Sequence, residues 1–202
     1  MKYLKFILFT YFFCLSPNLI AEIDPKIWLK SEIDIILASY QNENLPNENK
    51  FLMIEQTINN NFAGAGIAKF VSGKAWSNAS KDVKKKYIGL FKRHLALNIA
   101  SMMQGYSNQT YSLRNSKYIE QNKVTLIHME IVSDTNTILV TWRVKKSKDR
   151  FFVIDLVIAD ISLVETKRSE FNSMLKNVDY NLKEFNEILE DKNNLSYAKI
   201  IK

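Results

Sequence analysis

The stretch from Arg150 to Phe171 constrains the fold more than any other part of the chain. Its first half is apolar on both faces of a strand, with Phe152, Ile154, Leu156 and Ile158 on one face and Phe151, Val153 and Val157 on the other. A strand with two apolar faces is covered on both sides. Ser162, followed three residues later by Glu165, forms a capping box at a helix start. The stretch therefore predicts a buried strand that leads directly into a helix.

Asp155 is the one acidic residue inside this apolar run. A buried carboxylate needs hydrogen-bond donors. We therefore expect Asp155 to accept hydrogen bonds from a nearby helix end or turn.

Hydrophobic periodicity divides the rest of the chain into helices and strands. The period of 3.6 predicts helices near residues 24–40, 48–58, 62–71, 80–105, 163–175 and 180–189. The period of two predicts strands near 109–118, 123–132, 137–146 and 150–161, joined by short polar connections. The expected fold is α+β, with a four-stranded antiparallel sheet packed against several helices.

The N-terminus has the pattern of a secretory signal peptide. Lys2 and Lys5 precede a mostly apolar run at 6–15, and Ala21 offers a small residue for cleavage. We predict a signal peptide at 1–21, a single domain at 22–191 and a tail at 192–202. An uncleaved anchor is the alternative, although the apolar run is short for a membrane span.

Composition narrows the classes of partner. The only cysteine is Cys14, inside the predicted signal peptide, so the mature chain could form no disulfide. The chain has 28 Lys and Arg against 21 Asp and Glu, and two of the basic residues lie in the signal peptide. This excess of basic residues is small, and the sequence contains no recognisable nucleic-acid-binding motif. We therefore do not predict nucleic-acid binding.

Few residues could support catalysis or metal binding. The chain has two histidines, His94 and His128, and lacks the clustered ligands typical of zinc sites. Asp155 and Asp160 are the best carboxylate pair, but a spacing of five places them on opposite faces of a regular strand. No Gly-rich phosphate loop or G-x-S-x-G motif is present. We predict no catalytic residues, no metal and no cofactor.

Two blocks of sequence resemble the MlaC family, which is also called the toluene-tolerance or ABC-transporter auxiliary family. In the block 61–95 the matching residues are Phe62, Ile67, Ala68, Val71, Gly73, Trp76, Tyr87, Phe91 and Leu95. In the block 153–171 they are Asp155, Ser162, Leu163, Val164, Arg168 and Phe171. Four positions depart from the family pattern: Asn61 replaces Asp, Ser72 replaces Leu, Asp160 replaces Gly and Lys167 replaces Tyr.

The resemblance implies a periplasmic carrier with a deep cavity for the acyl tails of a phospholipid. It also implies exchange between an outer-membrane lipoprotein complex and an inner-membrane ABC transporter that carries an MCE-domain protein. The residues expected to line the cavity are Trp76, Phe91, Leu95, Met102, Met129, Val140, Trp142 and Ile154. Periodicity alone favours the alternative that these residues fill a closed core, and only the resemblance brings the two interpretations close to even.

Two other functions remain open from the sequence. A hydrolase or isomerase would need a polar pocket on which His128 and Asp155 converge. An adaptor that binds proteins through the basic segment 84–86 or through the sheet would have a filled interior. Arg168 could pair either with a lipid phosphate or with Glu165 on the same helix, and we favour the pair with Glu165.

Overall fold

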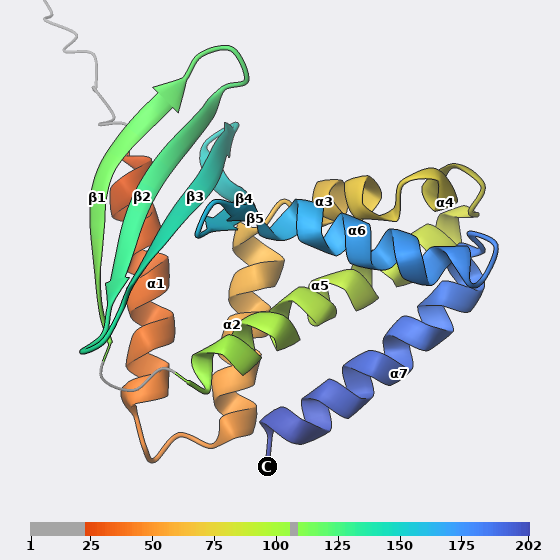
Figure 1. Cartoon of the computed structure of the whole chain (residues 1–202), viewed down its shortest axis with the longest axis horizontal. Helices are drawn as coiled ribbons and strands as arrows, with labels where there is room; N and C mark the ends of the chain where they lie inside the picture. Colours follow the sequence, from red (N-terminus) through yellow and green to blue (C-terminus); the bar gives the residue numbers. More distant parts are fainter. Residues whose placement is uncertain (1–22, 106–108) are drawn as a thin grey trace, which may run out of the picture.

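A computed structural model describes residues 23–105 and 109–202 and shows an α+β fold (Figure 1). The helices are α1 (Pro25–Gln41), α2 (Asn47–Asn61), α3 (Gly64–Ser72), α4 (Lys74–Ser77), α5 (Lys81–Met103), α6 (Leu163–Lys176) and α7 (Leu182–Ile200). The strands are β1 (Thr110–Ile119), β2 (Val124–Val132), β3 (Thr137–Ser147), β4 (Arg150–Ile158) and β5 (Ile161–Ser162). The predicted signal peptide lies outside the described residues. None of the helices in the described ranges combines the length and hydrophobicity needed to cross a bilayer.

The sheet is an antiparallel meander in which the strands lie in chain order, β1-β2-β3-β4-β5. The predicted α+β class and antiparallel sheet are confirmed, and the sheet has five strands instead of four. The extra strand arises because the chain turns back after Ile158 and pairs Ile161 with it. The two turn residues, Ala159 and Asp160, have φ values of 46° and 65°. Glycine adopts this left-handed conformation without strain and Asp tolerates it, which accounts for Asp160 in place of the Gly of the MlaC pattern.

An irregularity between β3 and β4 corrects one sequence expectation. Val153 pairs with Val144 and Asp155 pairs with Arg143, so Ile154 is an extra residue in β4. A bulge of this kind shifts the alternation of side chains by one position. Val153 therefore shares a face with Leu156, and Ile154 does not.

Asp155 joins β4 to the start of α6. Its carboxylate accepts hydrogen bonds from the Ser162 hydroxyl at 2.7 Å, from the Val164 amide at 3.1 Å and from the Arg143 guanidinium at 3.2 Å. Ser162 in turn caps the helix by accepting from the Glu165 amide at 3.1 Å. The expectation that Asp155 binds a helix end is confirmed, and so is the helix cap at Ser162.

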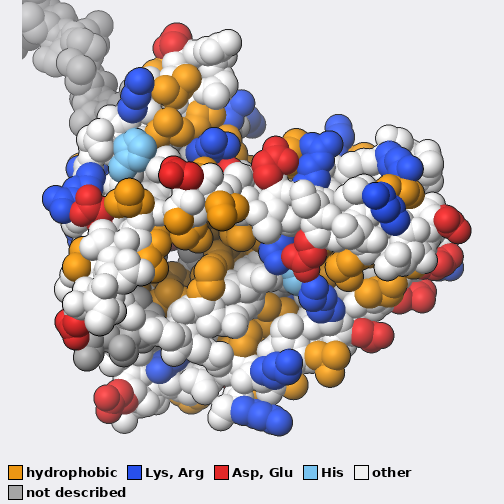
Figure 2. Space-filling model, in the orientation of Figure 1, with side chains coloured by type: hydrophobic (Ala, Val, Ile, Leu, Met, Phe, Trp, Pro, Cys, Tyr) orange, Lys and Arg blue, Asp and Glu red, His pale blue; other side chains and the backbone are white. Residues whose placement is uncertain are grey.

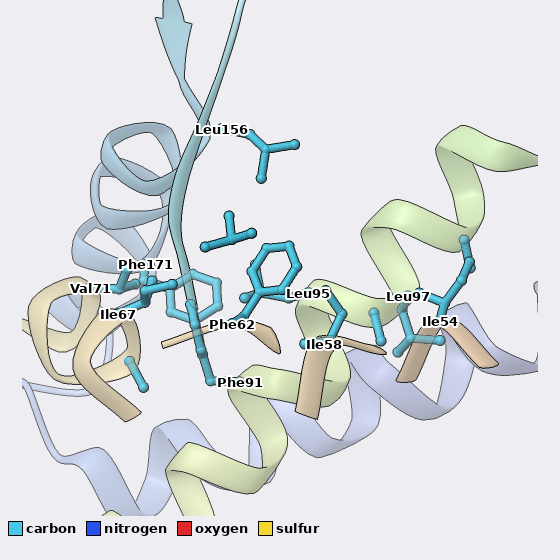
Figure 3. Close-up of a cluster of buried hydrophobic side chains, with 14 of the residues drawn as sticks. Ile54, Ile58, Phe62, Ile67, Val71, Phe91, Leu95, Leu97, Leu156 and Phe171 are labelled. Carbon is cyan, nitrogen blue, oxygen red and sulfur yellow. The ribbon is translucent and has the colours of Figure 1, made fainter. Parts of the chain in front are cut away.

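Aromatic side chains fill the core between α5, α6 and α7. The ring of Phe91 is 5.9 Å from that of Phe171, and Phe171 is 5.1 Å from Phe185. Tyr87 lies 6.0 Å from Phe91 and is fully buried. Figure 3 shows Phe91 and Phe171 beside the α3 residues Ile67 and Val71. The side chains in this part of the molecule are closely packed.

The last helix extends further than its periodicity predicts. We expected a helix to about Leu189 followed by a tail at 192–202, but α7 continues to Ile200. Asn193 is 1% exposed, and its amide donates a hydrogen bond to the Leu90 carbonyl at 2.9 Å. A polar residue at a buried position interrupts the apolar pattern, so the periodicity places the end of the helix too early.

The turn between β4 and β5 yields a stability prediction. Ala159 has φ 46°, whereas Ala63 has φ −73°. A left-handed alanine costs about 1 kcal/mol that glycine does not. We expect Ala159→Gly to raise the free energy of unfolding by about 1 kcal/mol, measured by urea denaturation. The matched change Ala63→Gly should leave it unchanged or lower, and a destabilised Ala159→Gly protein would contradict the assignment of strain.

Candidate functional site

The main cavity lies between the inner face of the sheet, helices α1 and α2, and the C-terminal end of α5. It has a volume of about 460 Å³, within the range of ligand pockets in proteins. Figure 2 shows a hollow in this region whose visible walls are hydrophobic side chains. Its apolar lining is Trp28, Leu29, Ile33, Ile36, Leu37, Ile54, Ile58, Phe62, Ile99, Met102, Met103, Met129, Ile131, Ile138, Val140, Trp142, Val153, Leu156 and Ile158.

The apolar walls follow from two periodicities. Along α1, Leu29, Ile33 and Ile36 recur at helical spacing and form one stripe. Along β3, Val140 and Trp142 alternate with outward-facing residues and therefore share the inner face. Because an apolar cavity offers water too few hydrogen-bond partners, it is suited to hydrocarbon.

A few polar side chains also line the cavity. Glu32 of α1 accepts a hydrogen bond of 2.5 Å from the side-chain amide of Asn61, at the end of α2, and Thr57 lies one helical turn before Asn61. The Tyr111 hydroxyl donates to Asp34. The pKa of Asp34 is lowered by its hydrogen bonds with Lys30 and Tyr111, despite some opposing desolvation.

The eight residues predicted to line a cavity fall into three groups. Met102, Met129, Val140 and Trp142 line the main cavity. Trp76, Phe91 and Leu95 do not line it: Phe91 and Leu95 are buried in the packed core, and the Trp76 ring lies 6.5 Å from that of Tyr87. Ile154 faces away because of the bulge in β4 and lines a second pocket. Whether any of the eight contacts a lipid stays a prediction.

Sequence reasoning missed the contribution of α1 and α2. The periodicity predicted helices near 24–40 and 48–58, but not that their residues Leu29, Ile33, Ile36, Ile54 and Ile58 form cavity walls. Periodicity identifies residues whose side chains are buried away from water. It does not show whether side chains of the opposite layer contact them or leave a cavity between.

The second pocket lies on the other face of β4, between α3 and the start of α6. It has a volume of about 300 Å³ and includes Phe70, Arg143, Ile154 and Asp155. Arg143 and Asp155 are already bonded to each other. The Arg168 guanidinium, for which we favoured a pair with Glu165, lies 4.2 Å from the centre of the Phe70 ring. A cation over an aromatic face is a stabilising contact, so Arg168 has a structural role here.

The two histidines lie in different parts of the molecule. His128 is on the outer face of the sheet, where Nδ1 is 3.0 Å from the Thr141 hydroxyl. His94 is buried, with Nδ1 3.0 Å from the side-chain oxygen of Asn193. Neither histidine lines the main cavity, and neither does Asp155. His128 and Asp155 therefore do not converge on it as a hydrolase or isomerase would require.

A charged network surrounds His94 without forming a metal site. Lys167 and Lys192 donate hydrogen bonds of 2.7 and 2.6 Å to the carboxylate of Glu170. Burial alone would raise the pKa of Glu170, but these two bonds outweigh it and lower the pKa to about 2. Within the described ranges, no group of three or more His, Cys, Asp or Glu residues is placed to hold a metal ion.

Burial of His94 predicts a pH-dependent stability. Desolvation, with the nearby charge of Lys167, lowers the pKa of His94 from 6.5 to about 4. Between these values the unfolded chain binds a proton that the folded chain does not. We expect the free energy of unfolding to fall by on the order of 3 kcal/mol as the pH drops from 6.5 to 4, measured by urea denaturation at a series of pH values.

The variant His94→Asn tests the assignment, because an Asn side chain can still reach Asn193. It should lose most of the slope between pH 6.5 and 4, whatever its absolute stability. The same substitution at His128 keeps His94 and should keep that slope. Equal slopes in both variants would contradict the role of His94.

Comparisons with known proteins place these observations in a family. The MlaC protein family matches residues 31–191. The 1.53 Å structure of a phospholipid-binding protein from Ralstonia solanacearum in complex with a phospholipid is similar in fold, with a TM-score of 0.73. It shares 17% sequence identity over 87% of this chain and 99% of its own. Among curated protein sequences, none matches this chain significantly.

Proposed function

Because the chain belongs to the MlaC family, as its sequence motifs predicted, we propose that it is a phospholipid carrier whose cavity encloses the acyl tails. The observation that carries the proposal is the cavity of about 460 Å³ between the sheet, α1 and α2, whose walls are almost entirely apolar. The phospholipid complex of the structural neighbour supports this choice of ligand.

The energy of burying hydrocarbon accounts for a carrier of this design. Each methylene that leaves water gains about 0.8 kcal/mol, so two chains of about 16 carbons gain more than about 20 kcal/mol. Such a ligand escapes into water very slowly. A carrier therefore has to release it by contact with a membrane or a partner protein, and it needs an enclosing surface instead of catalytic groups.

The family also suggests a more specific role. We propose that the protein works in the periplasm and moves phospholipid between an outer-membrane lipoprotein complex and an MCE-domain protein of an inner-membrane ABC transporter. The predicted signal peptide at 1–21 and membership in the MlaC family support this role. No nucleic acid or cofactor enters the proposal.

Native mass spectrometry of the protein purified from a membrane-bearing host tests the proposal. A carrier should retain phospholipid, detected as a mass increment and identified after extraction. A hydrolase would instead convert added substrate, and an adaptor would retain neither lipid nor substrate. Lipid-free protein from such a host would overturn the carrier proposal.

A matched pair of substitutions on β3 locates the ligand. Val140 is 4% exposed and lines the cavity, while its neighbour Leu139 is 60% exposed on the opposite face. We expect Val140→Trp to reduce the lipid bound per protein by at least about fivefold, because the indole occupies the cavity. Leu139→Trp should bind as much lipid as the wild type. Equal lipid content in the two variants would place the ligand elsewhere.

A further inference from the structure

One side chain of the cavity is charged. Among the described residues that line it, Glu32 is the only Asp, Glu, Lys or Arg. Its Oε2 atom accepts the 2.5 Å hydrogen bond from Asn61, and within residues 23–105 and 109–202 its Oε1 atom has no hydrogen-bond partner. A carboxylate beside an apolar space is costly unless its oxygens find donors or a cation. The cavity therefore has a place where an occupant with N–H donors or positive charge gains an interaction.

This place is the polar part of a mostly apolar lining. Glu32, Thr57 and Asn61 are partly exposed and lie on α1 and at the end of α2, next to the buried Leu29 and Ile58. The tails of a lipid would occupy the apolar part. Its polar end would then lie near these three side chains.

Two cations lie beside the same helix end. Asn59, Asn60 and Asn61 form the last residues of α2, and their bonds run to three different elements. The Arg150 guanidinium donates to the Asn60 carbonyl at 2.8 Å, and the Lys92 ammonium donates to the Asn59 carbonyl at 3.4 Å. Glu32 and Arg150, which carry opposite charges, are therefore hydrogen-bonded to two consecutive residues of α2, Asn61 and Asn60.

This arrangement matches a headgroup that carries both signs of charge. Arg150 is exposed and does not line the cavity, so a phosphate outside the lining could use the donors of Arg150 that Asn60 leaves free. An ammonium could pair with Glu32, and the C-terminal dipole of α2 favours a cation at the same end. A headgroup with a phosphate and no amine would leave the carboxylate without a partner and would be repelled by it.

We propose that Glu32 makes the cavity selective for phospholipids whose headgroup carries a primary ammonium, such as ethanolamine, over anionic headgroups such as glycerol. The selectivity rests on the proposed carrier function and specifies its substrate class. Glu32 contacts the ammonium, and Asn61 orients the carboxylate through its amide.

Competition between two lipids tests the selectivity. The full chain is incubated with vesicles of equal parts phosphatidylethanolamine and phosphatidylglycerol with the same acyl chains, and the bound lipids are counted by mass spectrometry. The wild type should bind the ethanolamine lipid in about fivefold excess, the ratio expected for one partly exposed ion pair. Glu32→Gln keeps an acceptor for Asn61 and should bring the ratio near one. The matched control, Glu43→Gln, removes a carboxylate from an exposed connector and should keep the excess.

A second measurement needs no variant. The ethanolamine lipid is replaced in the mixture by phosphatidylethanol, which has nearly the same size but no amine. The wild type should then show no preference over phosphatidylglycerol. A persistent preference, or an unchanged ratio in Glu32→Gln, would overturn the role of Glu32 while the total bound lipid still supported the carrier. Wild-type protein that takes up neither lipid would overturn both proposals.

Discussion

A single bulge opposite Arg143 decides what β4 does on each of its faces. It directs Val153 and Leu156 into the cavity wall and leaves Asp155 facing the start of α6. The buried carboxylate is held by three donors, from β3, from β5 and from the first turn of α6. Because a buried charge without partners is strongly unfavourable, this joint fixes β4 relative to the start of α6.

The molecule has a closely packed core in one half and an apolar cavity in the other. The rings of Tyr87, Phe91, Phe171 and Phe185 fill the space between α5, α6 and α7, and aromatic packing of this kind contributes a large share of stability. The sheet, α1 and α2 enclose space instead. An empty apolar cavity forgoes dispersion contacts with its walls, so a hydrocarbon occupant would stabilise this half of the molecule.

The polar groups follow the same division. In the helical half several of them bond to one another: Asn193 bonds to His94 and to the backbone, and Glu170 is held between Lys167 and Lys192. At the cavity Glu32 keeps one oxygen that no described residue binds. Charge that is fully paired supports the fold, whereas a cavity-lining charge with remaining bonding capacity is available to an occupant.

The sequence by itself determined the α+β class, the order of the longer helices and strands, the cap at Ser162 and the role of Asp155, because these depend on local periodicity and on the hydrogen-bonding needs of single groups. Only the tertiary structure decided that Phe91 and Leu95 meet other side chains while Met129 and Val140 face open space. It also placed Ile154 outside the cavity and extended α7 through buried Asn193. Periodicity predicts which residues are buried. The distance between two apolar layers is instead set by the packing of the helices and strands that hold the layers apart.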